Sequence, residues 1–88
     1  MTPRDERIVA TIFELLERCA SGATICPSDA ARALASDGSA WRALMPDVRR
    51  VAAALAAAGS LRVTAHGEDV DALQARGPIR LGRPLSRD

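Results

Sequence analysis

Aromatic side chains are almost missing from this sequence, which contains only Phe13 and Trp41 and has no tyrosine. Hydrophobic residues nevertheless make up 48% of the chain, a fraction too high for a disordered polypeptide. The core must therefore be built from aliphatic side chains and alanine. The 88 residues suffice for one domain with a modest core, and for no more.

Long apolar runs are also missing. No stretch approaches the roughly 20 residues that span a bilayer. The segment Met1–Arg7 is polar, and Glu14 and Glu17 interrupt the apolar stretch after it, which is unlike a secretory signal. We therefore expect a cytoplasmic protein with no membrane partner.

Cysteine and histidine are scarce, with Cys19, Cys26 and His66 the complete set. Two cysteines cannot form a disulfide framework, and the three residues match no recognised zinc spacing. We expect both cysteines to be small buried hydrophobes, although a single disulfide between them stays open. Catalytic motifs and phosphate-binding glycine loops are absent from the sequence, so we expect neither an enzyme nor a cofactor.

Lysine is absent, and all twelve basic residues are arginine in a chain of net charge +1. Residues 1–38 sum to −2, residues 39–66 to +3 and residues 67–88 to zero. The middle third is therefore the basic part. Arginine suits bidentate contacts with phosphate and guanine, although a compositional bias of the source genome would give the same result.

Helical periodicity occurs three times. The patterns predict helices over residues 4–20, over 27–35 and from Trp41 to a stop at Gly59, with Pro46 near the start of the third helix or at a kink. The phase of Trp41 predicts a core anchor. Residues 23–26, 61–65 and 78–81 have strand character, and 71–76 could form one helical turn.

This order predicts an α+β, mainly α, winged helix-turn-helix domain: three helices and a small antiparallel β-hairpin, the wing. The inward side chains of the hairpin cannot be buried without the helices. We place the domain at residues 4–82 and a flexible tail at 83–88. The hairpin residues expected to face inward are Leu61, Val63, Ile79 and Leu81.

Three segments resemble an uncharacterised bacterial family of unknown function: TICPSD at 24–29, WRALMPDVR at 41–49 and RGPIRL at 76–81. The similarity extends over about residues 6–82. It implies a winged-helix-like fold, and it brings no substrate, cofactor or established site.

Candidate site residues follow from the helical wheel and the strand alternation. Arg42, Arg49 and Arg50 should share an outward, unneutralised side of the third helix, among alanines. Arg62 and Arg80 should point outward from the two hairpin strands. The acids Glu68, Asp69 and Asp71 lie in the wing and argue against contact between the wing and DNA.

We therefore expect a nucleic-acid-binding module, with double-stranded DNA as the favoured partner and transcription regulation as a suitable role. The alternative is a protein-interaction or homodimerisation module that binds no nucleic acid. Its basis is the alanine-rich outer side of the third helix, the near-neutral charge and the acidic wing.

Overall fold

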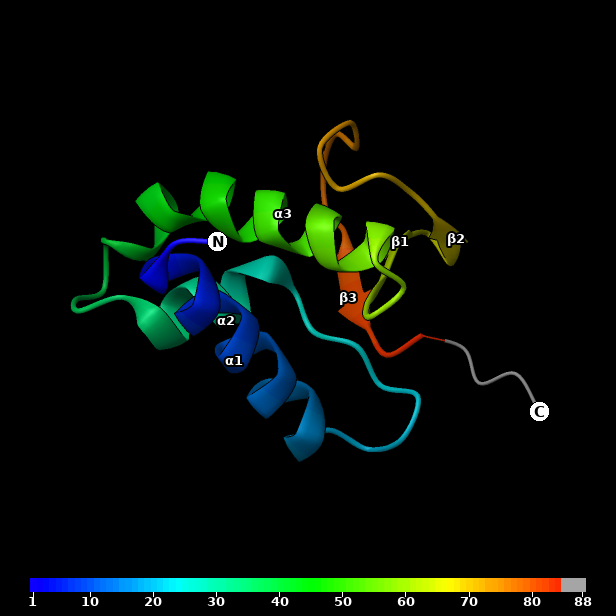
Figure 1. Ribbon diagram of the computed structural model, residues 1–88, viewed down its shortest axis with the longest axis horizontal. Helices are drawn as coiled ribbons and strands as arrows, with labels where there is room; N and C mark the ends of the chain where they lie inside the picture. The colour runs from blue at the N-terminus through cyan, green and yellow to red at the C-terminus, as the bar shows by residue number, and fades with distance from the viewer. Residues whose placement is uncertain (85–88) are drawn as a thin grey trace.

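The computed structural model describes residues 1–84, which form three helices followed by a three-stranded antiparallel sheet (Figure 1). The sheet order is β2-β1-β3. This mainly helical α+β arrangement has the expected winged-helix-like topology. The elements are α1 (Pro3–Arg18), α2 (Pro27–Leu34), α3 (Trp41–Ala57), β1 (Arg62–Ala65), β2 (Glu68–Asp69) and β3 (Arg80–Gly82).

Helix α1 begins at a capping box. The Thr2 hydroxyl accepts a hydrogen bond from the Asp5 amide at 3.1 Å, and the Asp5 carboxylate accepts one from the Thr2 amide at 3.4 Å. These bonds satisfy amide groups that a helix start leaves unpaired. The helix ends at Arg18, two residues before the predicted end.

Helices α2 and α3 form the helix-turn-helix pair. Pro27 is the first residue of α2, and Asp37 closes the connection to α3 by accepting hydrogen bonds from the Ser39 and Ala40 amides. Helix α3 continues through Pro46 without a break. Proline there removes one backbone hydrogen bond near the helix start, where packing of the following turns holds the helix.

The core lies where the three helices meet the inner side of the sheet. Buried side chains recur at three- and four-residue spacing in α1 and α3, and the short α2 buries two alanines. All four predicted inward hairpin residues are buried. The core consists of Ile8, Ile12, Leu16, Ile25, Ala30, Ala31, Val48, Val51, Ala52, Leu61, Val63, Ala72, Ile79 and Leu81.

The sheet differs from the prediction at two places. The expected strand at 23–26 is reduced to one bridge, in which Ile25 and Leu81 exchange two backbone hydrogen bonds of 2.8 Å. The short strand β2 was not predicted. It pairs with β1 through a tight turn at His66 and Gly67, whose φ angles of 53° and 83° suit a two-residue hairpin.

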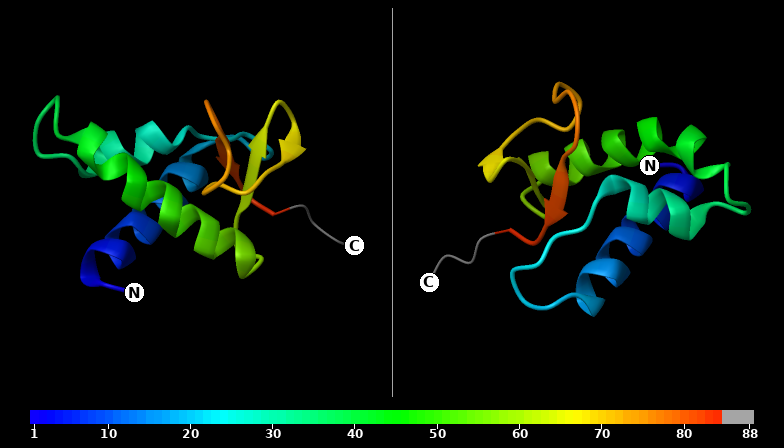
Figure 2. Two further views of the ribbon diagram at one scale, coloured as in Figure 1. Left: turned by 90° about the horizontal axis from the view of Figure 1, so that it is seen from above. Right: turned by 180° about the vertical axis from the view of Figure 1, so that it is seen from behind.

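The wing, defined here as residues 66–79, connects β1 to β3. The view from behind in Figure 2 shows the wing beside the C-terminal half of α3, and α2 and β3 are visible in the same view. The start of the predicted tail is attached to α1, because Arg83 donates a hydrogen bond to the Leu16 carbonyl at 3.3 Å. The rest of that tail, residues 85–88, lies outside the described residues. No helix among the described residues combines the length and apolarity needed to cross a membrane.

Candidate nucleic-acid interface

Arg50 is neutralised by two carboxylates. Its guanidinium donates hydrogen bonds of 2.7 and 3.0 Å to Asp5 and one of 3.2 Å to Asp47. Arg4 reaches Asp47 from α1 at 3.2 Å. Chiefly because of the hydrogen bonds from Arg50, the pKa of Asp5 falls to about 2, and the hydrogen bonds that Arg50 donates to Asp5 and Asp47 raise its own pKa. The expectation of an unneutralised Arg50 is therefore wrong.

Arg49 lies against the wing instead of facing free solvent. Its guanidinium donates hydrogen bonds to the carbonyls of Ala75 at 3.2 Å and Gly77 at 2.8 Å. Both acceptors are neutral, so Arg49 keeps its full positive charge while its geometry is fixed. Arg49 and Arg50 are successive residues, about 100° apart around α3. Arg49 turns to the wing, and Arg50 turns to α1.

Arg42 is the exposed arginine at the start of α3, and it contacts the ring of Trp41. The guanidinium carbons of Arg42 and of Arg32, from α2, lie 5.3 and 4.5 Å from the ring centroid. Trp41 packs against the core as predicted but is only half-buried, which leaves its ring accessible to both cations. No carboxylate pairs with Arg32 or Arg42 among residues 1–84.

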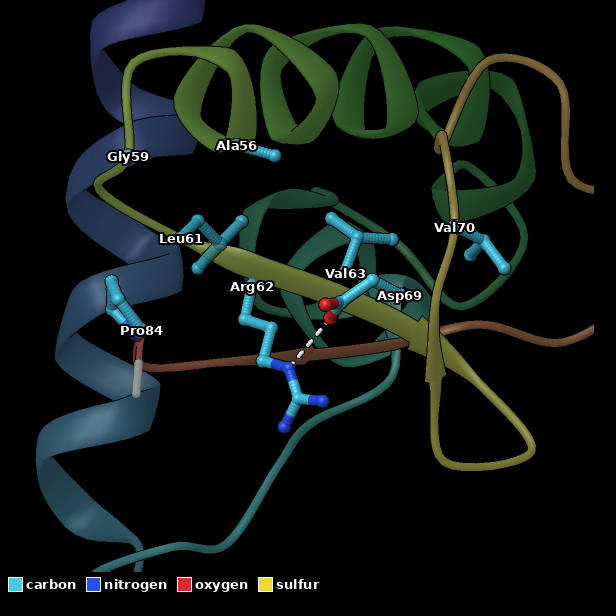
Figure 3. A pocket seen from close by; sticks show the side chains of 8 residues that line it. All are labelled: Ala56, Gly59, Leu61, Arg62, Val63, Asp69, Val70 and Pro84. Atoms are coloured by element: carbon cyan, nitrogen blue, oxygen red, sulfur yellow. Dashed lines mark hydrogen bonds and ion pairs between the residues drawn. The ribbon is translucent and has the colours of Figure 1, made fainter. Parts of the chain in front are cut away.

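The two strand arginines diverge. Arg62 turns toward β2 and pairs with Asp69 at 2.6 Å, at the rim of a shallow groove lined by apolar side chains (Figure 3). Arg80 turns the other way and donates to the Thr24 hydroxyl and carbonyl, both at 2.9 Å, and to the Cys26 sulfur. Arg62 is therefore neutralised, whereas Arg80 keeps its charge.

The predicted arginines thus fall into two classes. Arg50 and Arg62 are ion-paired, and Arg42, Arg49 and Arg80 either bind neutral acceptors or have no polar contact within residues 1–84. Arg42 and Arg49 are separated by seven residues, two helical turns or about 10 Å, so they share one flank of α3. The ion-paired class lies toward α1 and β2.

Two further arginines, outside the five candidate site residues, have no carboxylate partner among residues 1–84. Arg32 stacks on Trp41, and Arg76 lies between the two wing residues whose carbonyls bind Arg49. Arg32 could have been found, because residues near the end of α2 must approach the start of α3 across a short turn. We use the name arginine flank for the five arginines of α2, α3, the wing and β3 that pair with no carboxylate among residues 1–84: Arg32, Arg42, Arg49, Arg76 and Arg80.

On α3, Asp47 lies between Arg42 and Arg49 in the sequence, but it pairs with Arg4 and Arg50. Two further carboxylates near this flank, on α2 and the following turn, are also engaged. Asp29 accepts the Cys26 amide at 2.9 Å. Asp37 accepts the Ser39 amide and hydroxyl and the Ala40 amide, and these hydrogen bonds lower its pKa. Both carboxylates are therefore turned to backbone donors rather than to arginine.

The two cysteines and His66 are the remaining candidates for site chemistry. Both cysteines are free and half-buried, rather than fully buried as predicted. The Cys19 thiol donates a hydrogen bond to the Leu15 carbonyl at 3.3 Å. His66 is exposed in the hairpin turn. Within the described part of the chain, no three His, Cys, Asp or Glu side chains are grouped to hold a metal ion.

Comparison with curated proteins gives no match to this chain. A family model described as a protein of unknown function, DUF3253, matches residues 5–84. The match covers all six helices and strands except the first residues of α1, and it confirms the resemblance to a family of unknown function. The chain therefore belongs to the DUF3253 family.

Proposed function

We propose that this chain is a non-catalytic winged-helix module that binds double-stranded DNA, a function suited to transcription regulation. The observation that supports the proposal most is the arginine flank. Its side chains come from α2, the helix α3 that would enter the major groove, the wing and β3. No carboxylate among residues 1–84 pairs with them, so their positive charge would attract phosphates.

The helix-turn-helix geometry adds to this argument. Arg42 is exposed at the N-terminal end of α3, the end from which recognition helices contact bases. Beside it, Arg32 also stacks on the Trp41 ring, and no carboxylate pairs with either guanidinium among the described residues.

The test is a fluorescence-anisotropy titration of a random duplex at several salt concentrations between 50 and 200 mM. If three to five phosphates are neutralised, log affinity should fall with log salt at a slope of about −3 to −5. The same strand in single-stranded form should bind more weakly. Absence of binding at low salt, or a slope near zero, would contradict the proposal.

Two variants sharpen the titration. The double variant Arg32→Gln/Arg42→Gln should make the slope shallower by about 2, because each phosphate contact contributes about 0.9. Arg18→Gln is the matched single-charge control, since Arg18 ends α1, away from α3 and the wing. Its slope should equal that of the unmodified chain. Equal losses in all arginine variants would indicate an effect of net charge alone.

A protein-interaction module is the second candidate, and one observation favours it. Leu73 in the wing is 62% exposed and borders a groove lined mainly by alanines of α3. Sedimentation over a concentration series distinguishes the candidates. Self-association that Leu73→Ser abolishes, in a chain that binds no duplex, would support the second candidate and replace the first.

A further inference from the structure

The wing consists of two halves with different charge. The hairpin half, residues 66–69, carries Glu68 exposed at its end and Asp69 paired with Arg62. The return half, residues 70–79, leads back along α3 to β3. Phosphates are repelled by the exposed acid of the hairpin half. Of the three acids that argued against a DNA-contacting wing, Glu68 and Asp69 lie in the hairpin half, and Asp71 lies at the start of the return half, where its carboxylate accepts the Leu73 amide.

The return half is fixed at three points. Ala72 and Ile79 are buried in the core, and between them the carbonyls of Ala75 and Gly77 accept hydrogen bonds from Arg49. Near its start, Asp71 organises a turn, because its carboxylate accepts the Leu73 amide at 2.8 Å and its carbonyl accepts the Ala75 amide at 2.8 Å. The segment is therefore held against α3 instead of extending into solvent.

Arg76 lies between the two carbonyls that bind Arg49, and its side chain is exposed. No carboxylate pairs with Arg49 or Arg76 among the described residues. An exposed guanidinium without a carboxylate partner is free to pair with an anion from outside the chain, such as a phosphate. The backbone turns at Gly77 with a φ of 82°, a left-handed conformation that glycine adopts without strain.

We infer that the wing contacts the DNA backbone through Arg76 on its return half, and that the hairpin tip does not. Arg49 is the positioning residue, because its bidentate hydrogen bonds hold the segment that carries Arg76 beside α3. This inference rests on the proposed function. The ligand is a backbone phosphate, so the wing contact adds affinity without reading sequence.

The test combines duplex titration with amide hydrogen exchange in the absence of DNA. Arg76→Gln should make the salt slope shallower by about 1 and weaken binding by a similar factor on unrelated duplexes. Arg76→Gln should leave amide exchange unchanged. Glu68→Gln, at the hairpin tip, should leave the slope unchanged, as should the control Arg18→Gln.

Arg49 is tested by two variants that separate its charge from its geometry. Arg49→Lys keeps the charge but cannot bind two carbonyls through a rigid planar fork. We expect amide exchange in residues 70–79 to rise at least tenfold in Arg49→Lys and Arg49→Gln alike. The salt slope should become shallower in Arg49→Gln by more than in Arg49→Lys.

The outcomes are distinguishable. A slope of −3 to −5 that Arg76→Gln leaves unchanged would overturn the wing contact and leave the proposed function standing. If the salt slope becomes steeper in Glu68→Gln and stays unchanged in Arg76→Gln, the wing contact would be assigned to the hairpin tip. Unchanged exchange in both Arg49 variants would overturn the positioning role. An unmodified chain that binds no duplex would overturn the proposed function and, with it, the contact at Arg76.

Discussion

Asp5 and Arg50 are 45 residues apart in the sequence and form a bidentate ion pair, with nitrogen–oxygen distances of 2.7 and 3.0 Å. Asp5 is 3% exposed, whereas the Arg50 side chain is 50% exposed. The pair joins the first turn of α1 to the middle of α3. Asp5 therefore takes part in the N-terminal cap of α1 and also attaches α1 to α3.

Removal of Arg50 should destabilise the protein. Arg50→Met leaves the buried Asp5 carboxylate without its main partner, and we expect Tm to fall by roughly 5–10 °C. Arg42→Met is the matched control, because Arg42 lies on the same helix and pairs with no carboxylate within residues 1–84. Thermal melting by circular dichroism measures both. Equal Tm values for the two variants would contradict the role given to the pair.

The same pair predicts a loss of stability in acid. The folded pKa of Asp5, about 2, lies below its ordinary value of 3.8. A lowered carboxyl pKa stabilises the folded state fully above the unfolded value, and the contribution is lost as pH falls through the folded value. Melts between about pH 5 and pH 2 should show this loss, and Arg50→Met should reduce it. An identical pH dependence in both chains would contradict the assignment to Asp5.

Gly82 is predicted to tolerate no side chain. A Cβ at Gly82 would meet the Thr24 Cγ2 at 2.9 Å, because β3 runs close to the segment that precedes α2. Gly82→Ala should lower the free energy of unfolding by about 1–3 kcal/mol through overpacking. Gly38→Ala is the control, since its Cβ would meet nothing within 4 Å. Urea denaturation compares them, and a Gly82→Ala chain as stable as Gly38→Ala would contradict the prediction.

The two strand arginines should differ in their effect on duplex binding. Arg80→Gln removes a charge of the arginine flank, and the salt slope should become shallower by about 1. Arg62→Gln/Asp69→Asn removes an ion pair without changing net charge, so its slope should be unchanged. Anisotropy titration measures both. A shallower slope in the double variant would place the interface on the β2 side of the sheet.

Much of the fold was predictable because it depends on periodicity. Ile8, Ile12 and Leu16 in α1, and the alternation of Leu61 and Val63, indicate which side is buried without any knowledge of partners. Strand β2 was not predictable, because its two residues, Glu68 and Asp69, are exposed and carry no alternation. It exists because the turn at His66 brings them alongside β1.

The candidate site was less predictable than the fold. A helical wheel places Arg49 and Arg50 on the outer side of α3, but the neutralisation of Arg50 depends on Asp5, in a different helix. The hydrogen bonds of Arg49 depend equally on the path of the wing, and the wing sequence has no periodic pattern from which that path could be predicted. Ion pairing between distant residues is a property of tertiary packing, and single-sequence patterns do not contain it.

The bridge between Ile25 and Leu81 has a consequence for synthesis of the chain on the ribosome. The three helices can associate as soon as α3 has emerged, because their contacts involve only the first 57 residues. Ile25 lacks its backbone partner, Leu81, until translation has proceeded beyond all three helices. The nascent domain therefore passes through a stage in which the three helices are assembled and the backbone of Ile25 is still unpaired.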